Sequence, residues 1–392
     1  MRWMNNMGEK VVLGISKHNM DGQKKVCIYG AGILGKDLYN VLKHYGMFSC
    51  FIDNNEKIQK EGYNGESVFS EEDFFKNKKN NIIIIAATED NTIKIKDNLE
   101  RRGLQNNKEF YTYENFLENV LPVLIYNLYN QLFINLCQIC VTERCTLKCK
   151  KCAHGCYAVD RDNPDLTLEQ VKQSADIFFS KVDYIHEFVL IGGEPMLYPY
   201  LRQAIEYIGK NYRDKINIFS ITTNGTILPN DELLCICKKY NVLFRVSNYS
   251  NAISKLEAQY VRLEAIFQKG NVKYRIGKKE NNWMDYGFDY YKRECKDEEL
   301  IKVFDDCHTP CHEIRENRFY YCVMARSVSD NLNFNVGRDD YLDFNQLTGE
   351  NWKRVFLEYI LGYSEKGYLD MCRYCHGADC YNYLIPAAEQ LE

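Results

Sequence analysis

The chain has 392 residues, more than one hydrophobic core usually serves, so we expect two or three domains. Its 45% hydrophobic and 27% charged residues are typical of a soluble globular protein. A formal net charge of −4 gives no bulk basic bias, which argues against nucleic acid as a partner.

The first residues, MRWMNNMGEKVVLG, lack the apolar run and small-residue cleavage site of a signal peptide. The most apolar segment, residues 121–141, is interrupted by asparagine and glutamine, which predicts a buried helix followed by a strand and no membrane span. We therefore expect a cytoplasmic protein. Thiols stay reduced there, so its 17 cysteines favour metal binding over disulfides.

Residues 25–53 indicate a strand, a glycine turn, an amphipathic helix and a second strand that ends at Asp53, and a third strand follows at 81–88. Gly30, Gly32 and Gly35 fit the G-x-G-x-x-G fingerprint, with Asp53 near the position that binds a ribose. The pattern predicts a small Rossmann-like domain over residues 1–122. It leaves open whether the glycines bind a nucleotide or only form a tight turn.

From residue 133 onward, strand patterns alternate with helix patterns, which predicts a parallel sheet or barrel in a domain over residues 123–300. The expected strands lie at 133–143, 184–194, 216–225, 242–250 and 272–277, and the expected helices at 166–180, 199–212, 230–241 and 252–268. Polar and cysteine-rich motifs follow several of these strands, where such folds place their chemistry.

Cys145, Cys149 and Cys152 are spaced C-x3-C-x2-C just after the first of these strands. Structural zinc normally takes four ligands as two pairs, which this spacing fits poorly. A 4Fe–4S cluster held by three thiolates leaves one iron open for another ligand. Cys137 and Cys140 lie on the strand itself and are expected to be core residues, and His154 and Cys156 are expected to be bystanders.

With GGEP at residues 192–195 and TTNGTIL at 222–228, the cysteine motif resembles the radical S-adenosylmethionine (SAM) superfamily over about residues 133–277. The resemblance implies a partial (β/α)6 TIM-like barrel, a three-cysteine 4Fe–4S cluster and SAM as cofactors. It implies that the following residues contact SAM: Gly192, Gly193, Glu194, Thr223, Asn224 and Ser247.

Lys151 departs from the family pattern, because many members carry an aromatic residue near the adenine just before the third cysteine. Another side chain, such as Tyr157, would then flank the base. The stretch CKKCAHG itself resembles a subgroup found with bacterial surface-polysaccharide genes.

A second group of cysteines lies in residues 301–392, where residues 314–322 alternate like a hairpin turning at Glu316 and Asn317. The region resembles a twitch extension, a shortened SPASM domain with one auxiliary 4Fe–4S cluster. The preferred ligands are Cys311, Cys322, Cys372 and Cys375, with Cys307 and Cys380 as spares. Two cysteine pairs also suit zinc, which stays an alternative.

These features together predict an α/β protein: a small Rossmann-like parallel-sheet domain, a partial barrel and a small cysteine-rich iron–sulfur extension. The expected activity is radical chemistry of an oxidoreductase or epimerase type on a sugar, nucleotide sugar or glycan precursor, with a flavodoxin or ferredoxin as reductant. A peptide-modifying maturase is the alternative enzyme, and a non-catalytic, metal-stapled binding protein is the alternative of another class.

Overall fold

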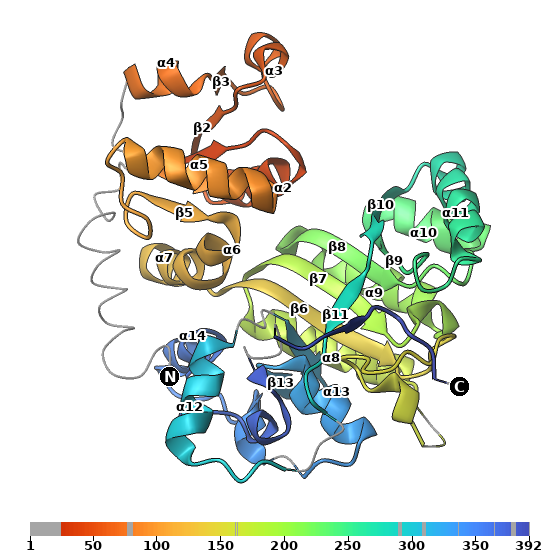
Figure 1. Cartoon of the computed structure of the whole chain (residues 1–392). Helices are drawn as coiled ribbons and strands as arrows, with labels where there is room; N and C mark the ends of the chain where they lie inside the picture. Colours follow the sequence, from red (N-terminus) through yellow and green to blue (C-terminus); the bar gives the residue numbers. More distant parts are fainter. Residues whose placement is uncertain are drawn as a thin grey trace. The chain divides into compact units, whose positions relative to one another are not determined.

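The computed structural model describes residues 25–76, 81–160, 162, 164–288, 292–307, 311–335, 337–363, 365–377 and 382–391 (Figure 1). These residues form two compact units, which meet in sequence between residues 133 and 134. We call residues 25–133 the N-terminal unit and residues 134–391 the C-terminal unit. Cys380, a spare ligand in the sequence prediction, lies outside the described residues.

The N-terminal unit contains a five-stranded parallel sheet in the order β3-β2-β1-β4-β5. Its strands are β1 (Val26–Tyr29), β2 (Phe48–Ile52), β3 (Val68–Phe69), β4 (Ile82–Ile85) and β5 (Phe110–Thr112). Both β1 and β4 are buried along their whole length, as expected for central strands of a covered parallel sheet. β1, β2 and β4 match the sequence prediction, whereas β3 and β5 are too short to show a period.

Helices connect these strands. They are α2 (Ile33–His44), α3 (Glu56–Glu61), α4 (Glu71–Lys76), α5 (Glu89–Arg101), α6 (Tyr113–Asn115), a π-helix (Phe116–Val120) and α7 (Leu121–Tyr129). The apolar stretch at 121–141 is α7 followed by β6 (Phe133–Thr142), as predicted. None of the helices in the described ranges is long and apolar enough to cross a membrane.

The C-terminal unit is built on an eight-stranded sheet in the order β10-β9-β8-β7-β6-β12-β13-β14. Its first part repeats strand and helix, and all the strands and helices predicted from residue 133 onward are present. The strands are β6, β7 (Tyr184–Gly192), β8 (Ile216–Thr223), β9 (Val242–Asn248) and β10 (Lys273–Lys279), and the helices are α8 (Leu168–Lys181), α9 (Leu201–Tyr212), α10 (Asp231–Lys239) and α11 (Leu256–Gly270).

Aromatic side chains fix the helices on one face of this sheet. Phe178 on α8 packs against Phe188 on β7 with ring centroids 5.4 Å apart, and Phe267 on α11 packs against Phe244 on β9 at 4.6 Å. Because side chains alternate along a strand, the neighbours of Phe188 and Phe244 face the opposite side of the sheet. Figure 1 shows β7 to β9 side by side with α8 to α11 around them.

Further strands of the C-terminal unit extend the same sheet, and two others form a separate two-stranded sheet. β12 (His312–Arg315) is parallel to β6, and its hairpin with β13 (Arg318–Tyr320) turns at Glu316 and Asn317, as predicted. The remaining elements are β11 (Asn282–Met284), α12 (Asp297–Asp306), α13 (Val323–Asn331), β14 (Tyr341–Asp343), α14 (Trp352–Ile360) and β15 (Leu384–Pro386). The predicted domain boundary at residue 300 thus falls inside one compact unit.

The strand order differs from the expected (β/α)6 arrangement in one respect. A sixth parallel strand would follow β10 if the chain continued around a partial barrel. Instead β12 lies beside β6, at the opposite end of the row of parallel strands. The observed architecture is therefore a parallel α/β sheet extended by an antiparallel hairpin.

Candidate functional site

The cysteine motif occupies the loop that follows β6. Its three cysteines lie within eight residues of one another, and the charges of Cys152 and Cys145 add to burial in raising the pKa of Cys149. In the part of the chain that the structure describes, no three His, Cys, Asp or Glu side chains converge as ligands of a single metal ion. This does not exclude a cluster, because thiolates that each bind a different iron of one 4Fe–4S cluster are further apart than the ligands of one ion.

Each of the three sulfurs accepts at least one N–H group. Asn224 Nδ2 lies 3.6 Å and the backbone N of Leu147 3.4 Å from Cys145 Sγ, and Gln390 Nε2 lies 3.1 Å from Cys149 Sγ. Cys152 accepts from the Cys156 thiol and from backbone N–H groups of the same turn. Such donors stabilise a thiolate, which is the form that binds iron.

The thiols differ in acidity in the absence of metal. The bond from Cys156, together with the backbone N–H groups of the turn, lowers the pKa of Cys152 to about 7 against the opposing effect of burial. Burial raises the pKa of Cys145 to about 11 and that of Cys149 to about 12. Cys156, expected to be a bystander, therefore acts directly on one predicted ligand.

The GGEP segment packs against the start of the cysteine loop. Gly193 N donates to Thr142 O at 2.9 Å, and Glu194 N donates to Arg144 O at 2.8 Å. A Cβ atom on Gly193 would lie 2.4 Å from Arg144 O and 2.8 Å from Cys145 Cβ, which no real side chain tolerates. The glycine is thus required where the end of β7 meets the loop; its contact with SAM stays a prediction.

Glu194 joins the end of β7 to the end of β8. Its buried carboxylate accepts hydrogen bonds from Thr223 Oγ1 at 2.7 Å, Asn224 N at 2.8 Å and Met196 N at 3.1 Å. Burial raises its pKa, opposed by these three donors. A carboxylate has about four acceptor positions. The three bonds use three of these positions, and the carboxylate is fully buried in this structure. Its contact with the ammonium group of SAM stays a prediction.

The structure brings most of the predicted SAM residues together around Glu194, but it places Ser247 further along the sheet. Asn224 also donates to Thr146 Oγ1 at 3.1 Å, which ties the end of β8 to the cysteine loop. Ser247, on β9, bonds to Tyr249 through its side chain, and the Tyr249 phenol feels the charges of Cys149 and Cys152. Tyr249, the residue directly after β9, thus lies near two of the thiols.

Lys151 forms an ion pair that its sequence position does not predict. Its backbone is left-handed, with φ +58°, and its Nζ lies 3.2 Å from Asp285 Oδ2. Both side chains are largely buried, with 19% and 12% of their surfaces exposed. The residue that replaces the usual aromatic side chain is therefore held by an acid just after β11.

A buried charge network below the loop was not visible in the sequence. Arg326 on α13 is fully buried and pairs with Glu143 and Glu313, and Asn331 on the same helix donates to Glu143 Oε2 at 3.0 Å. The pKa of Glu143 falls to about 2, because Arg326 and Asn331 outweigh its burial. The arginine in the apolar stretch VMARSV was the one available signal.

A second polar group lies on the sheet face that points away from the helices. Glu187, next to Phe188 on β7, accepts from Ser220 Oγ at 2.6 Å and pairs with Arg245 at 2.5 Å. Glu187 is 3% exposed, whereas 41% of the Arg245 side chain is exposed. A charged residue in the middle of the apolar strand YIHEFVLIG was the signal for this group.

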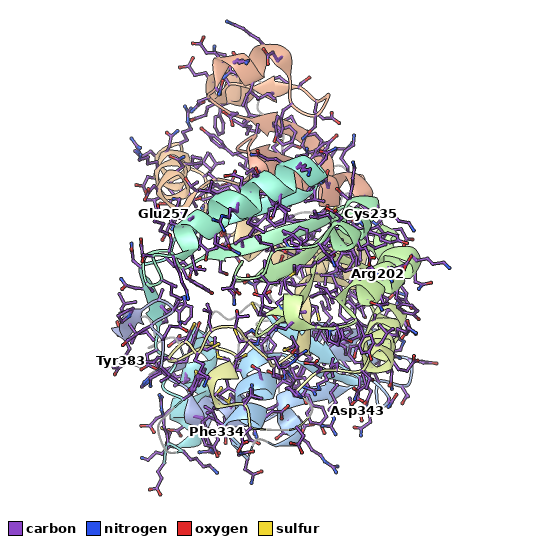
Figure 2. The ribbon with its side chains drawn as sticks, turned by 90° about the vertical axis from the view of Figure 1, so that its right-hand side faces the viewer. Arg202, Cys235, Glu257, Phe334, Asp343 and Tyr383 are labelled. Atoms are coloured by element: carbon purple, nitrogen blue, oxygen red, sulfur yellow. The ribbon has the colours of Figure 1, made fainter. Side chains whose placement is uncertain are left out.

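The four preferred auxiliary ligands belong to one apolar cluster: Cys375 is among its buried residues, and Cys311, Cys322 and Cys372 are partly buried and pack against the cluster. Phe334, labelled in Figure 2, stacks on the intervening Tyr374 with ring centroids 4.3 Å apart. Burial, with the nearby thiols of Cys307 and Cys375 acting in the same direction, raises the pKa of Cys322 well above its usual value. The spare Cys307 is thus close to Cys322, and the assignment of Cys311 as a ligand stays a prediction.

In the N-terminal unit, the fingerprint forms a tight turn. Gly30 has φ +119°, and a Cβ there would lie 2.3 Å from Ala86 O, while a Cβ on Gly35 would lie 1.9 Å from Gly30 O. Gly32 has open space around its Cα. Asp53 Oδ2 accepts from Ala31 N at 2.8 Å, so this acid caps the turn itself. The tight turn by itself therefore explains why residues 30 and 35 are glycines, with no need of a bound nucleotide.

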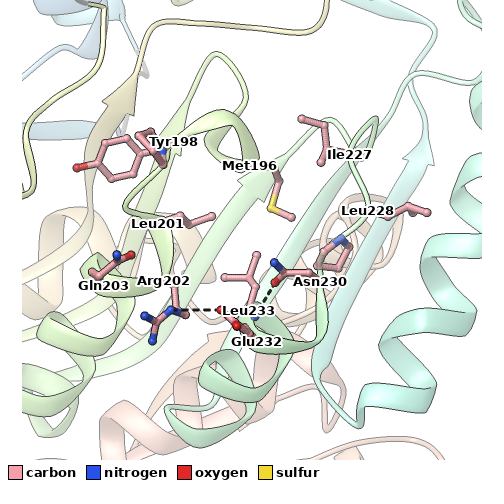
Figure 3. Close-up of a pocket in the computed structure, with 12 residues that line it drawn as sticks. Met196, Tyr198, Leu201, Arg202, Gln203, Ile227, Leu228, Asn230, Glu232 and Leu233 are labelled. Atoms are coloured by element: carbon pink, nitrogen blue, oxygen red, sulfur yellow. Dashed lines mark hydrogen bonds and ion pairs between the residues drawn. The ribbon is translucent and has the colours of Figure 1, made fainter.

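A cavity of about 390 Å³ opens after the GGEP segment and beside the end of the TTNGTIL segment (Figure 3). Arg202 and Glu232 form an ion pair of 3.8 Å at its edge. It is lined by Met196, Tyr198, Pro199, Leu201, Arg202, Gln203, Ile227, Leu228, Pro229, Asn230, Glu232 and Leu233. None of the predicted site residues lines it.

Comparison with known proteins identifies the domain that carries these motifs. The model of the radical SAM superfamily matches residues 139–255, so this part of the chain is a radical SAM domain. Among curated protein sequences, none matches the chain.

Several solved structures are similar to parts of the chain. Polyhistidine-tagged anSMEcpe with bound AdoMet is 20% identical, over 37% of this chain and 43% of that one, with a TM-score of 0.31. Streptococcus suis SuiB bound to precursor peptide SuiA is 20% identical, over 47% and 44%, with a TM-score of 0.31. BtrN in complex with AdoMet and 2-DOIA is 16% identical, over 64% and 98%, with a TM-score of 0.37. The chain thus covers less than half the length of the first two.

The residues of the cysteine loop fit the cluster and cofactor of this superfamily. Three thiols on one loop, each already facing N–H donors, suit a 4Fe–4S cluster with one open iron. Glu194 is tied to the same loop through Asn224.

Proposed function

We propose that the protein is a radical SAM enzyme that cleaves SAM reductively. The observation that carries this proposal is the junction of the three-cysteine loop with GGEP and Asn224, within residues 139–255 that match the superfamily. When bound, a reduced cluster supplies one electron to the sulfonium, which yields methionine and a 5′-deoxyadenosyl radical that abstracts a hydrogen atom from substrate.

The chain's own residues would position the reactants. Cys145, Cys149 and Cys152 hold the cluster, and Glu194 accepts from the ammonium group of SAM at its remaining position. Thr223 and Asn224 hold the Glu194 carboxylate in place at 2.7 Å and 2.8 Å. The glycines at 192 and 193 bring this carboxylate against the loop.

For the substrate, we propose a sugar, nucleotide sugar or glycan precursor, oxidised or epimerised after hydrogen abstraction. The Glu187–Arg245 pair supports a polar substrate, because it stands on the sheet face opposite α8 to α11 and leaves much of the arginine exposed. The N-terminal unit resembles the small Rossmann-like units of bacterial glycan and nucleotide-sugar proteins, which is why we prefer a sugar to the peptide alternative. An auxiliary 4Fe–4S cluster of the twitch type and a flavodoxin or ferredoxin as electron donor complete the proposal.

The test is anaerobic reconstitution with iron and sulfide, reduction, and measurement of 5′-deoxyadenosine formed from SAM. The wild-type chain should form it, and Cys145→Ala, Cys149→Ala and Cys152→Ala should each lose at least about a hundredfold, because each ligand is needed for cluster binding. Cys235→Ala is the matched control, since Cys235 is an exposed thiol on α10 outside the site, and it should keep full activity.

The substrate proposal is tested with a panel of nucleotide sugars deuterated at the sugar carbons. Transfer of deuterium into 5′-deoxyadenosine would support it. Transfer only from peptide substrates would favour the maturase alternative. If a chain with its full content of iron and sulfide forms no 5′-deoxyadenosine, the non-catalytic binding protein is the remaining hypothesis.

A further inference from the structure

The segment of residues 384–391 returns to the cysteine loop. β15 pairs antiparallel with β11, and beyond this ribbon Lys150 N donates to Glu389 O and Leu391 N donates to Lys148 O, each at 2.7 Å. Cys149 and Gln390 form the antiparallel bridge between these two bonds. The middle cysteine of the motif is therefore paired through its main chain with a segment far away in sequence. Tyr383, which leads into this segment, is labelled in Figure 2.

The side chain of Gln390 reaches the sulfur of the same cysteine. Its Oε1 accepts from Lys148 N at 2.9 Å, and its Nε2 lies 2.7 Å from Ala388 O and 3.1 Å from Cys149 Sγ. A backbone N–H only donates and a carbonyl only accepts, so these two neighbours determine the orientation of the amide. The group that faces the sulfur is therefore an N–H donor.

The same ribbon holds the loop on the other side of Cys149. Asp285, directly after β11, pairs with Lys151 at 3.2 Å, and its backbone N donates to Tyr383 O at 2.8 Å. Lys151 keeps a left-handed backbone, which is unfavourable for a residue with a side chain and needs support from its surroundings. Residues 148 and 151 are thus anchored by two ends of one β-ribbon.

We propose that the β11–β15 ribbon positions Cys149 and that the Gln390 N–H raises the reduction potential of the cluster bound there. This inference rests on the proposed function, because it assumes that Cys149 is an iron ligand. An N–H donated to a ligand sulfur stabilises the reduced state, which carries one more negative charge, more than the oxidised state. Gln390 would then make the cluster easier to reduce.

The test compares Gln390→Glu and Gln390→Leu with the wild-type full chain after anaerobic reconstitution. Glutamate keeps the acceptor for Lys148 N and removes the N–H donor, whereas leucine removes both. The readout is a redox titration of the electron paramagnetic resonance signal that changes when SAM is added, since only the cluster with an open iron responds to it. In both variants we expect the equilibrium constant for reduction to fall about tenfold, a shift of about 59 mV to more negative potential for one electron.

The control is the double variant Lys150→Met with Glu389→Gln. It removes the exposed 2.6 Å ion pair of the same segment at constant net charge and leaves the Gln390 side chain in place, so its potential should equal that of the wild type. Gln390 variants that bind iron and keep the wild-type potential would overturn the inference while the proposed function stands. Absence of a SAM-responsive signal in the wild type would overturn both. If the leucine variant loses its iron, Gln390→Met decides, because it removes the N–H donor without adding the negative charge that glutamate places beside the sulfur.

Discussion

His186 lies within β7 on the face covered by helices, 5% exposed, with its Nδ1 3.2 Å from Asn217 Nδ2. Burial lowers its pKa to about 3, with Arg245 and Arg275 acting in the same direction. The imidazole is therefore neutral in the folded protein at pH values where it is protonated in the unfolded chain, whose histidine pKa is about 6.5.

This difference predicts acid sensitivity. Between pH 6.5 and 3 the unfolded chain binds more protons at this site, so the stability contribution is present above pH 6.5 and is lost as the pH falls. Between pH 7 and pH 5 the wild-type protein should lose about 2 kcal/mol more free energy of unfolding than His186→Gln. Urea unfolding of both proteins at the two pH values measures this. Equal losses would show that His186 is not held neutral.

At the scale of elements, α13 connects the cysteine loop to the hairpin that extends the sheet. Its Arg326 pairs with Glu143 at the end of β6 and with Glu313 on β12. Its Asn331 donates to His154 O at 2.8 Å, and a Cβ on Gly155 would lie 3.3 Å from Asn331 Cβ. The turn that carries Cys152 thus rests directly on this helix.

Removal of Arg326 should leave two acids buried without their partner. Arg326→Met is expected to destabilise the C-terminal unit by about 3–5 kcal/mol, measured by chemical unfolding. Arg354→Met on α14 is the matched control, because Arg354 is 57% exposed and pairs with Glu358 one turn away. It should cost about 0.5 kcal/mol or less. A similar small cost for Arg326→Met would contradict a stabilising role of this network, and Glu313→Gln added to it should restore part of the stability.

For the whole molecule, α13 has one group of thiols near each of its ends: the helix begins directly after Cys322 and ends at Asn331, which contacts the cysteine loop. If both groups bind 4Fe–4S clusters, the reconstituted chain should hold about eight irons. Cys322→Ala and Cys372→Ala should each lose about half of them and keep the SAM-responsive signal.

The same iron count distinguishes the two candidate ligands. Of Cys307→Ala and Cys311→Ala, the variant that removes a true ligand should lose iron and the other should keep it. About four irons in the wild-type chain would contradict the auxiliary cluster, and zinc in their place would favour the alternative.

Local patterns accounted for much of the fold. Alternation of apolar residues and helical periods predicted β6 to β10 and the helices between them, because the apolar pattern of each strand or helix lies within one continuous stretch of the sequence. The spacing of Cys145, Cys149 and Cys152, with GGEP one strand later, indicated the superfamily for the same reason. Short strands such as β3 and β5 were not predicted, since two or three residues are too few to show a hydrophobic period.

By itself, the sequence determined the parallel α/β architecture from residue 133, the three-cysteine loop and the motifs at the strand ends. Only the tertiary structure decided that β12 lies beside β6, that Arg326 joins Glu143 to Glu313, and that Gln390 meets Cys149. These contacts join residues far apart in the chain, and their geometry depends on packing and charge pairing. The hydrophobic pattern of neighbouring residues does not indicate which distant residues pair, so these contacts are seen only in the folded chain.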